Sequence, residues 1–146
     1  MSANAKRIQH LGIAVRELEP AVEFYRDKLG LPLVEQKEMP DRGLRVAFLQ
    51  AGDTLVELLA PLHEGSEISR FLDKRGEGIH HICFDVPDIL KSLDALRKDG
   101  VRVISKEPTI GAEGYPVAFL HPKSCNGVLI ELLEETLPED AGKGGA

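Results

Sequence analysis

Two histidines and two glutamates recur at matching places in the two halves of this sequence. His10 is the fourth residue of RIQHLGIAV, and His81 is the fourth residue of GIHHICFDV. Glu57 follows His10 by 47 residues, and Glu131 follows His81 by 50 residues. Each glutamate has a leucine two positions before it and two positions after it, so in a strand it would share one face with leucines. A carboxylate in that setting is costly unless it is paired or bound to a metal.

Two imidazoles and two carboxylates form a ligand set for a divalent metal ion. This mixture of nitrogen and oxygen donors suits cobalt, nickel, zinc or manganese, and it lacks the thiolates of a structural zinc site. Four protein ligands on an octahedral ion leave two positions open for two oxygens of one substrate. The ion would act as a Lewis acid that stabilises an enolate, while neighbouring carboxylates move a proton on and off the adjacent carbon. Oxygen-activating sites more typically use two histidines and one carboxylate, so the second glutamate argues against an oxygenase.

Each of these residues also has an ordinary explanation when it is taken alone. A single histidine in a strand is more often a hydrogen-bonded core or surface residue, and a lone glutamate often faces water at a sheet edge. Duplication of the pair on matching strands favours the metal site. His63 and His121 have no counterpart in the other half, so we interpret them as loop or strand-end residues. Side chains alternate along a strand, so His80 is expected on the face opposite His81 as a structural histidine.

The elements that must position these residues are themselves repeated. Each half starts with an alternating strand, continues with a helix and ends with three strand-like runs, giving the order β-α-β-β-β twice. The first helix is predicted to have Pro20 near its start and Gly30 as its stop, and the second to run from an N-cap at Asp88 to a stop at Gly100. The strand-like runs are LPLVEQKE, LRVAFLQ and TLVELLA in the first half, and VRVIS, YPVAFLH and GVLIELLE in the second.

The length and composition describe one soluble domain. A chain of 146 residues with 42% hydrophobic content can bury a sizeable core, whereas neither half alone looks able to close one. We therefore predict an α+β fold in which two βαβββ modules, residues 7–61 and 78–134, form a curved, incompletely closed eight-stranded barrel around a metal site. Residues 62–77 would connect the modules, with one or two helical turns around 68–72. The polar, glycine-rich tail at 135–146 is expected to be disordered.

Charge and cysteine usage limit the partners and the compartment. The net charge of -6 argues against general binding to nucleic acid or to an anionic membrane, which requires a basic face. Cys83 and Cys125 form no CxxC pair, and the N-terminal MSANAKRIQH lacks the apolar core of a signal peptide, so a cytoplasmic location is expected. No apolar run approaches the roughly 20 residues that span a bilayer.

Four longer motifs, within a match over about residues 7–134, carry a family resemblance. They are LLAPL, GEGIHHI, KEPTIGAEG and, above all, FLHPKSCNGVLIEL. On these motifs the chain resembles the methylmalonyl-CoA epimerase family of the vicinal oxygen chelate superfamily, whose shared architecture is the glyoxalase fold. The resemblance implies paired modules around one divalent metal ion per subunit, with cobalt favoured over zinc, nickel or manganese, and a homodimer. The metal ligands that it implies are His10, Glu57, His81 and Glu131.

The implied reaction interconverts (R)- and (S)-methylmalonyl-CoA. The proton between the thioester and the carboxylate is removed, and one oxygen of each group binds the metal. Direct proton transfer needs a base on each side of the planar enolate. Glu131 matches one base of the family, but at the position where some members have a second glutamate this chain has Val46. Our hypothesis is that Glu57, which is glutamine in those members, supplies the missing carboxylate.

Two loops contain further candidate functional residues. The candidate contacts to the acyl-CoA substrate are His121, Lys123 and Gly111. The same residues are also explained by an ordinary hairpin in which the lysine is solvated and the glycines form turns.

The alternative enzyme is lactoylglutathione lyase, which uses the same metal frame on a glutathione hemithioacetal. That family more often has an acidic DPDG-like turn where this chain has HPKSCNG. A non-enzymatic, drug-sequestering member of the fold would lack the metal ligands, so the four retained residues argue against it.

Overall fold

The computed structural model describes residues 2–135, which form two compact units. The first unit is Ile8–Ile82, and the second consists of the described residues on either side of it. Strands β1 (Arg7–Ala14) and β5 (Gly78–Asp85) each have residues in both units. The described residues contain eight strands in the predicted order, so the α+β class and the duplicated β-α-β-β-β order are confirmed. Apart from Glu135, the predicted disordered tail lies outside the described residues.

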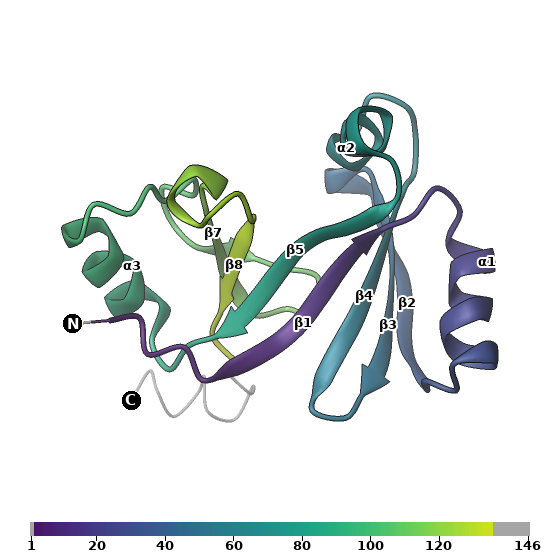
Figure 1. Ribbon diagram of the computed structural model, residues 1–146, viewed down its shortest axis with the longest axis horizontal. Helices are drawn as coiled ribbons and strands as arrows, with labels where there is room; N and C mark the ends of the chain where they lie inside the picture. The colour runs from purple at the N-terminus through teal and green to yellow at the C-terminus, as the bar shows by residue number, and fades with distance from the viewer. Residues whose placement is uncertain (1, 136–146) are drawn as a thin grey trace. The chain divides into compact units, whose positions relative to one another are not determined.

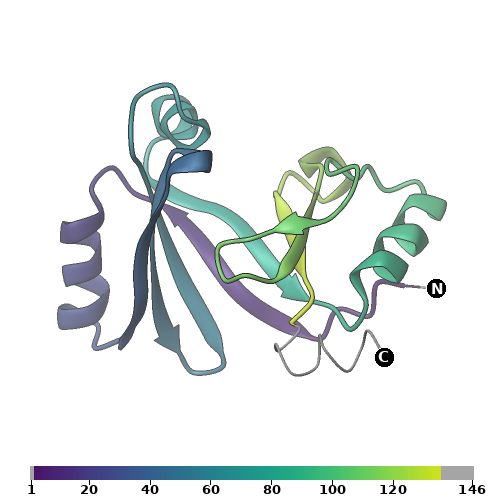
Figure 2. The same cartoon turned by 180° about the vertical axis from the view of Figure 1, so that it is seen from behind.

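The first unit holds one part of the β-sheet (Figure 1). Strands β2 (Leu33–Met39), β3 (Leu44–Ala51) and β4 (Thr54–Pro61) pair antiparallel in sequence order, and β1 pairs in parallel with β4. The view from behind shows β2 and β3 running side by side (Figure 2). All three runs predicted after the first helix are therefore strands.

The two faces of this sheet differ in character. One face packs against α1 (Leu18–Glu23) through Leu18 and Val22, and its strand residues form a buried apolar cluster. The strand residues of that cluster are Ala47, Leu49, Val56, Leu58 and Ala60. The opposite face carries His10 and Glu57, because side chains alternate along β1 and β4. Helix α1 thus covers one face of the sheet, and His10 and Glu57 lie on the other face.

Helix α1 does not continue as a regular α-helix to its predicted stop at Gly30. From Phe24 to Lys28 the backbone is π-helical, with a hydrogen bond of 3.0 Å from the Leu29 N–H to the Phe24 carbonyl. The wider turn changes which side chains face the sheet, so Leu29 is 54% exposed. Gly30 then ends the segment with a positive φ of 82°, as a C-terminal glycine does.

Helix α2 (Glu67–Arg75) forms the predicted helical part of the connector and is longer than the one or two turns expected. Ser66 caps it, because its hydroxyl accepts a hydrogen bond of 3.2 Å from the Ser69 N–H. Ile68 and Leu72 are the buried residues of this helix. The amphipathic helix is therefore held to the first unit by one apolar face.

The second unit holds a further part of the β-sheet and one helix (Figure 1). Strands β6 (Thr109–Ile110), β7 (Pro116–Leu120) and β8 (Ile130–Leu133) pair antiparallel in sequence order. Helix α3 (Ile89–Lys98) begins as predicted at Asp88, whose carboxylate accepts a hydrogen bond of 3.1 Å from the Lys91 N–H. The core between them is apolar and consists of Val86, Ile89, Leu93, Ala118, Leu120 and Leu132.

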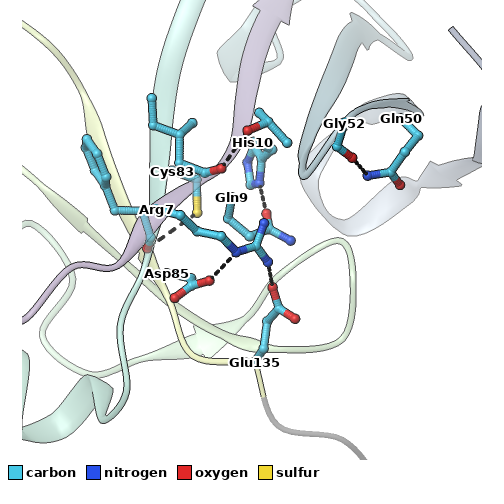
Figure 3. Close-up of polar contacts among 11 residues, drawn as sticks. Arg7, Gln9, His10, Gln50, Gly52, Cys83, Asp85 and Glu135 are labelled. Carbon is cyan, nitrogen blue, oxygen red and sulfur yellow. Dashed lines mark hydrogen bonds and ion pairs between the residues drawn. The ribbon is translucent and has the colours of Figure 1, made fainter.

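The N-terminal residues belong to the second unit. The Ser92 hydroxyl on α3 donates a hydrogen bond of 2.9 Å to the Ala3 carbonyl. Arg7 forms an ion pair of 2.7 Å with Asp85 and a second ion pair with Glu135 (Figure 3). These contacts join the start of β1 to the end of β5 and to the segment after β8.

The prediction of a strand at VRVIS was wrong. Only Val103 forms a β-bridge, to Leu120, and the strand of this region is instead β6, which lies between two of the predicted runs. The Phe119 N–H donates to the Ser105 hydroxyl oxygen at 3.0 Å, so a side chain takes the place of a backbone carbonyl there. The Arg97 guanidinium of α3 also donates to the Ser105 carbonyl at 3.1 Å.

The helices of residues 2–135 are all too short or too polar to cross a bilayer.

Candidate metal site

Three buried side chains of the first unit bring their donor atoms together. The Nε2 atoms of His10 and His81 lie 3.0 Å apart. Each of these nitrogens lies 3.3 Å from Oε1 of Glu57. The residues come from β1, β4 and β5, and none is more than 5% exposed. Three of the four predicted ligands therefore meet at one point.

The triangle of donor atoms has the dimensions of a metal site. Ligands bound at about 2.1 Å lie about 3.0 Å apart when they subtend a right angle at the ion and about 3.4 Å apart at a tetrahedral angle. The separations of 3.0 and 3.3 Å fall within that range. Imidazole nitrogen with carboxylate oxygen is also a donor set that cobalt, nickel, zinc and manganese accept. The residues present thus fit a divalent ion.

Strand register and one glycine create this arrangement. In the β1–β4 pairing Gly12 lies opposite Glu57, and His10 lies two residues away on the same face. A Cβ on Gly12 would lie only 2.2 Å from Cε1 and 2.4 Å from Nδ1 of His81. The missing side chain therefore makes the space into which the His81 imidazole fits.

The two histidines control the charge of Glu57. Burial by itself would raise the pKa of this carboxyl, but hydrogen bonds and charge interactions with His10 and His81 outweigh the burial and lower the pKa to about 2. Glu57 is therefore ionised at neutral pH, and its charge is buried together with its partners. An anionic oxygen between two imidazoles is an arrangement that a divalent cation stabilises.

Each site histidine contacts a neighbour through its second ring nitrogen. Oε1 of Gln9 lies 2.5 Å from Nδ1 of His10 (Figure 3). Nδ1 of His80 lies 2.9 Å from Nδ1 of His81. His80, which we expect on the face opposite His81 as a structural histidine, is partly buried, and its ring reaches back to the His81 imidazole. Gln9 was missed; its only sequence signal is that it precedes His10 as His80 precedes His81.

Glu131 and Val46 are both buried, but they differ in what they can do. Glu131 lies on β8 in the second unit, is 5% exposed and pairs with Phe119 across the strands. Val46 lies on β3 with 0% exposure, opposite Leu59. Because Phe48 lies opposite Glu57 in the same ladder, Val46 and Glu57 occupy the same sheet face. Position 46 therefore holds an apolar side chain on the sheet face that carries Glu57.

The loop residues have local structural roles. Nδ1 of His121 accepts a hydrogen bond of 3.0 Å from the Lys123 N–H and caps the 3₁₀ turn Pro122–Ser124. The Gly111 N–H donates to the Tyr115 carbonyl at 2.9 Å, and a Cβ on Gly111 would lie 2.9 Å from a Val117 methyl. These roles explain the residues as parts of turns, and substrate contact by any of them stays a prediction.

The remaining histidine lies in a loop, as predicted. His63 is exposed, and its Nδ1 lies 3.0 Å from the Glu64 carbonyl. His121 directly follows the last residue of β7, so its interpretation as a strand-end residue is also confirmed. Within the described residues, the histidines that converge on Glu57 are the two that the internal repeat singled out.

Comparison with known proteins gives consistent matches along most of the chain. The family model described as Glyoxalase/Bleomycin resistance protein/Dioxygenase superfamily matches residues 9–119. The chain is 50% identical over 128 residues to the ethylmalonyl-CoA/methylmalonyl-CoA epimerase of Cereibacter sphaeroides, covering 86% of this chain and 96% of that protein. It is 45% identical to the mitochondrial methylmalonyl-CoA epimerase of Homo sapiens, covering 88% of this chain and 74% of that protein.

Solved structures agree with these matches. A Streptomyces coelicolor methylmalonyl-CoA epimerase variant in complex with 2-nitronate-propionyl-CoA superimposes with a TM-score of 0.87 at 38% identity, covering 92% of this chain and 100% of that chain. The lactoylglutathione lyase of Escherichia coli O157:H7 is more distant, at 25% identity over 94% of this chain and 97% of that protein. The predicted glyoxalase fold is confirmed by the family match and the structural likeness.

Proposed function

We propose, because the chain belongs to the Glyoxalase/Bleomycin resistance protein/Dioxygenase superfamily and within it to the methylmalonyl-CoA epimerases, that it interconverts (R)- and (S)-methylmalonyl-CoA. The observation that carries the proposal is the convergence of His10, Glu57 and His81 within 3.3 Å of one another. The reaction needs stabilisation of an enolate and carboxylates that exchange a proton, and this set provides the groups for both.

His10, Glu57 and His81 would hold a divalent ion, with Glu131 as the fourth ligand. Two facts support Glu131: it occupies in the second half the position of Glu57 in the first, and it is a buried carboxylate on a strand. A divalent ion bound there supplies Lewis-acid stabilisation of the negative charge that develops on the thioester oxygen. Cobalt is the ion that we favour, and nickel, zinc and manganese suit the same donors.

Two carboxylates would carry out the proton transfer. One carboxylate removes the proton from the carbon between the thioester and the carboxylate, leaving the electron pair of the C–H bond in the enolate. The other, which starts as a carboxylic acid, delivers its proton to the opposite face of the same carbon. We assign these roles to Glu131 and Glu57. Val46 has no group that accepts a proton, so β3 supplies no base at its position.

The basicity of Glu57 depends on what its histidine neighbours do. A carboxylate with a pKa of about 2 is a weak base at neutral pH, and donation by His10 and His81 causes that low value. When both Nε2 lone pairs are committed to a cation, neither nitrogen can donate to Oε1. A cation bound beside the carboxylate would then supply the positive charge that keeps Glu57 ionised.

The wider assignments follow from the family and from the composition. We propose a homodimer that acts on a small acyl-CoA in the cytoplasm, without nucleic-acid or membrane partners. The net charge of -6 supports the absence of nucleic-acid binding, because counterion displacement requires a basic surface. The name of the Cereibacter sphaeroides relative includes ethylmalonyl-CoA, so this thioester belongs in the assay.

The test is proton exchange at the reacting carbon, followed by NMR in heavy water. Metal-stripped protein and protein reloaded with cobalt, zinc, nickel or manganese would be supplied with methylmalonyl-CoA, ethylmalonyl-CoA, or methylglyoxal plus glutathione. Metal-dependent exchange with inversion of methylmalonyl-CoA is the expected result. Formation of lactoylglutathione without any exchange of the CoA thioesters would overturn the substrate assignment and leave the metal site in place.

A further inference from the structure

The residues that precede the two site histidines are themselves a repeated pair. Gln9 precedes His10 in the first copy, and His80 precedes His81 in the second. Each preceding side chain places a polar atom within hydrogen-bond distance of Nδ1 on the following imidazole. In both copies the other ring nitrogen, Nε2, is the one that faces Glu57.

The first pair is buried and chemically matched. Gln9 is 3% exposed, and its Oε1 lies 2.5 Å from Nδ1 of His10. An amide oxygen can only accept a hydrogen bond, so this contact requires a proton on Nδ1. Neutral imidazole carries one N–H, so when Nε2 binds a cation through its lone pair the N–H is on Nδ1, where the Gln9 oxygen accepts it.

The second pair works in the same way with a different acceptor. Nδ1 of His80 lies 2.9 Å from Nδ1 of His81, so one of these nitrogens donates and the other accepts. If the His81 Nε2 lone pair binds a cation, the His81 N–H is on Nδ1 and His80 is the acceptor. His80 then carries its own proton on Nε2.

Helix α2 holds the ring of His80. The Phe71 ring meets it edge to face, with 4.7 Å between the ring centroids. The Arg75 guanidinium carbon lies 5.9 Å from the centroid of the same Phe71 ring. Aromatic contacts of this kind fix ring orientation. The connector between the two halves of the sequence therefore orients a side chain that touches the site.

We propose that Gln9 and His80 are positioning residues, which hold His10 and His81 in the tautomer and orientation that bind a divalent ion through Nε2. The inference rests on the metal site proposed above and adds to it two residues that do not touch the ion. Ligand histidines commonly donate their second N–H to an outer partner, and loss of that partner typically weakens metal binding by about 10- to 100-fold. The repeat would thus have duplicated each ligand together with the residue that orients it.

The experiment compares metal affinity in variants of matched shape. Gln9→Leu removes the acceptor oxygen, and His80→Phe keeps a ring while removing both nitrogens. Gln9→Glu keeps an acceptor oxygen and serves as the rescue variant. Gln50→Leu and His63→Phe are matched controls, because the Gln50 side chain donates to the Gly52 carbonyl of its own turn (Figure 3) and Nδ1 of His63 contacts the Glu64 carbonyl. Dissociation constants for Co²⁺ come from chelator competition, with the cobalt visible spectrum as a second readout.

The expected result is a 10- to 100-fold weaker affinity in Gln9→Leu and in His80→Phe, with an altered cobalt spectrum. Gln9→Glu should recover most of the affinity, and both controls should bind as the wild type does. Equal affinities and identical spectra in all variants would overturn the inference while leaving the metal site standing. A wild-type protein that binds no divalent ion would overturn both.

Tautomers measured on the wild-type protein provide a test that does not depend on the variants folding. Long-range ¹H–¹⁵N NMR of the Zn²⁺-loaded protein reports which ring nitrogen carries the proton. We expect Nδ1–H in His10 and His81 and Nε2–H in His80. A proton on Nδ1 of His80 would exclude it as the acceptor and overturn its assigned role.

Discussion

Gly12 and the imidazole of His81 are in such close contact that a methyl group on Gly12 would lie 2.2 Å from the ring carbon Cε1. The backbone of Gly12 is not in the left-handed region, so alanine could adopt its conformation. The cost of Gly12→Ala would therefore fall on the His81 ring, which must move away from His10 and Glu57. We expect a destabilisation of about 1–3 kcal/mol, as for overpacked cores, and metal binding weakened at least about tenfold, as for misoriented ligands.

Chemical denaturation and cobalt titration measure these two effects. Gly30→Ala is the control, because Gly30 has a φ of 82° and open space around it, so alanine there causes backbone strain without touching the site. Gly30→Ala should lower the free energy of unfolding by roughly 1 kcal/mol and leave the metal affinity unchanged. Normal cobalt binding by Gly12→Ala would show that the His81 ring does not need this space.

Glu57→Gln separates metal binding from proton transfer. The amide retains an oxygen that can bind a cation but cannot accept the substrate proton, so metal should remain bound while inversion falls by about 100-fold or more. Deuterium exchange at the reacting carbon should persist for the epimer whose proton faces Glu131. Measuring exchange and inversion separately for each epimer distinguishes these steps. Glu38→Gln, at an exposed position of β2, is the control. Inversion at the wild-type rate with metal bound would exclude Glu57 as a base.

Much of this site could be predicted from the repeat, because duplication made His10 and His81 equivalent and strand alternation gave the face of each glutamate. The contacts of Gln9 and His80 could not be predicted. They depend on side-chain rotamers, which the period of a strand does not determine. The short strand β6 was missed for a different reason. Its place is decided by pairing with β7 and by the hydrogen bond that the Ser105 hydroxyl accepts from the Phe119 N–H, whereas local propensity favoured VRVIS.

A rescue experiment tests whether the two glutamate positions can exchange roles. Val46 and Glu57 lie on the same face of the β3–β4 ladder, so a glutamate at position 46 would be placed beside the same site. We expect Val46→Glu combined with Glu57→Gln to recover part of the inversion that Glu57→Gln alone loses. Val46→Glu alone should be less stable than the wild type, because it adds a buried carboxylate. Denaturation and the epimer-resolved exchange assay measure both effects, and Val46→Gln with Glu57→Gln is the control that lacks a base. No gain over that control would mean that the position cannot supply a base in this chain.

The stability of the metal-free protein should depend on the ionisation of Glu57 in acid. Its pKa is about 2 in the folded state against an ordinary value of 4.5, so the ionised carboxylate stabilises the fold above about pH 4.5. This contribution, of about 3 kcal/mol for a shift of that size, is lost progressively as the pH falls from 4.5 towards 2. Urea denaturation of metal-free wild type and Glu57→Gln across that range measures it. The difference in the free energy of unfolding between the two proteins should shrink as the pH falls, because glutamine does not titrate. A difference that stays constant between pH 5 and pH 2.5 would show that the contacts of Glu57 with His10 and His81 do not depress its pKa.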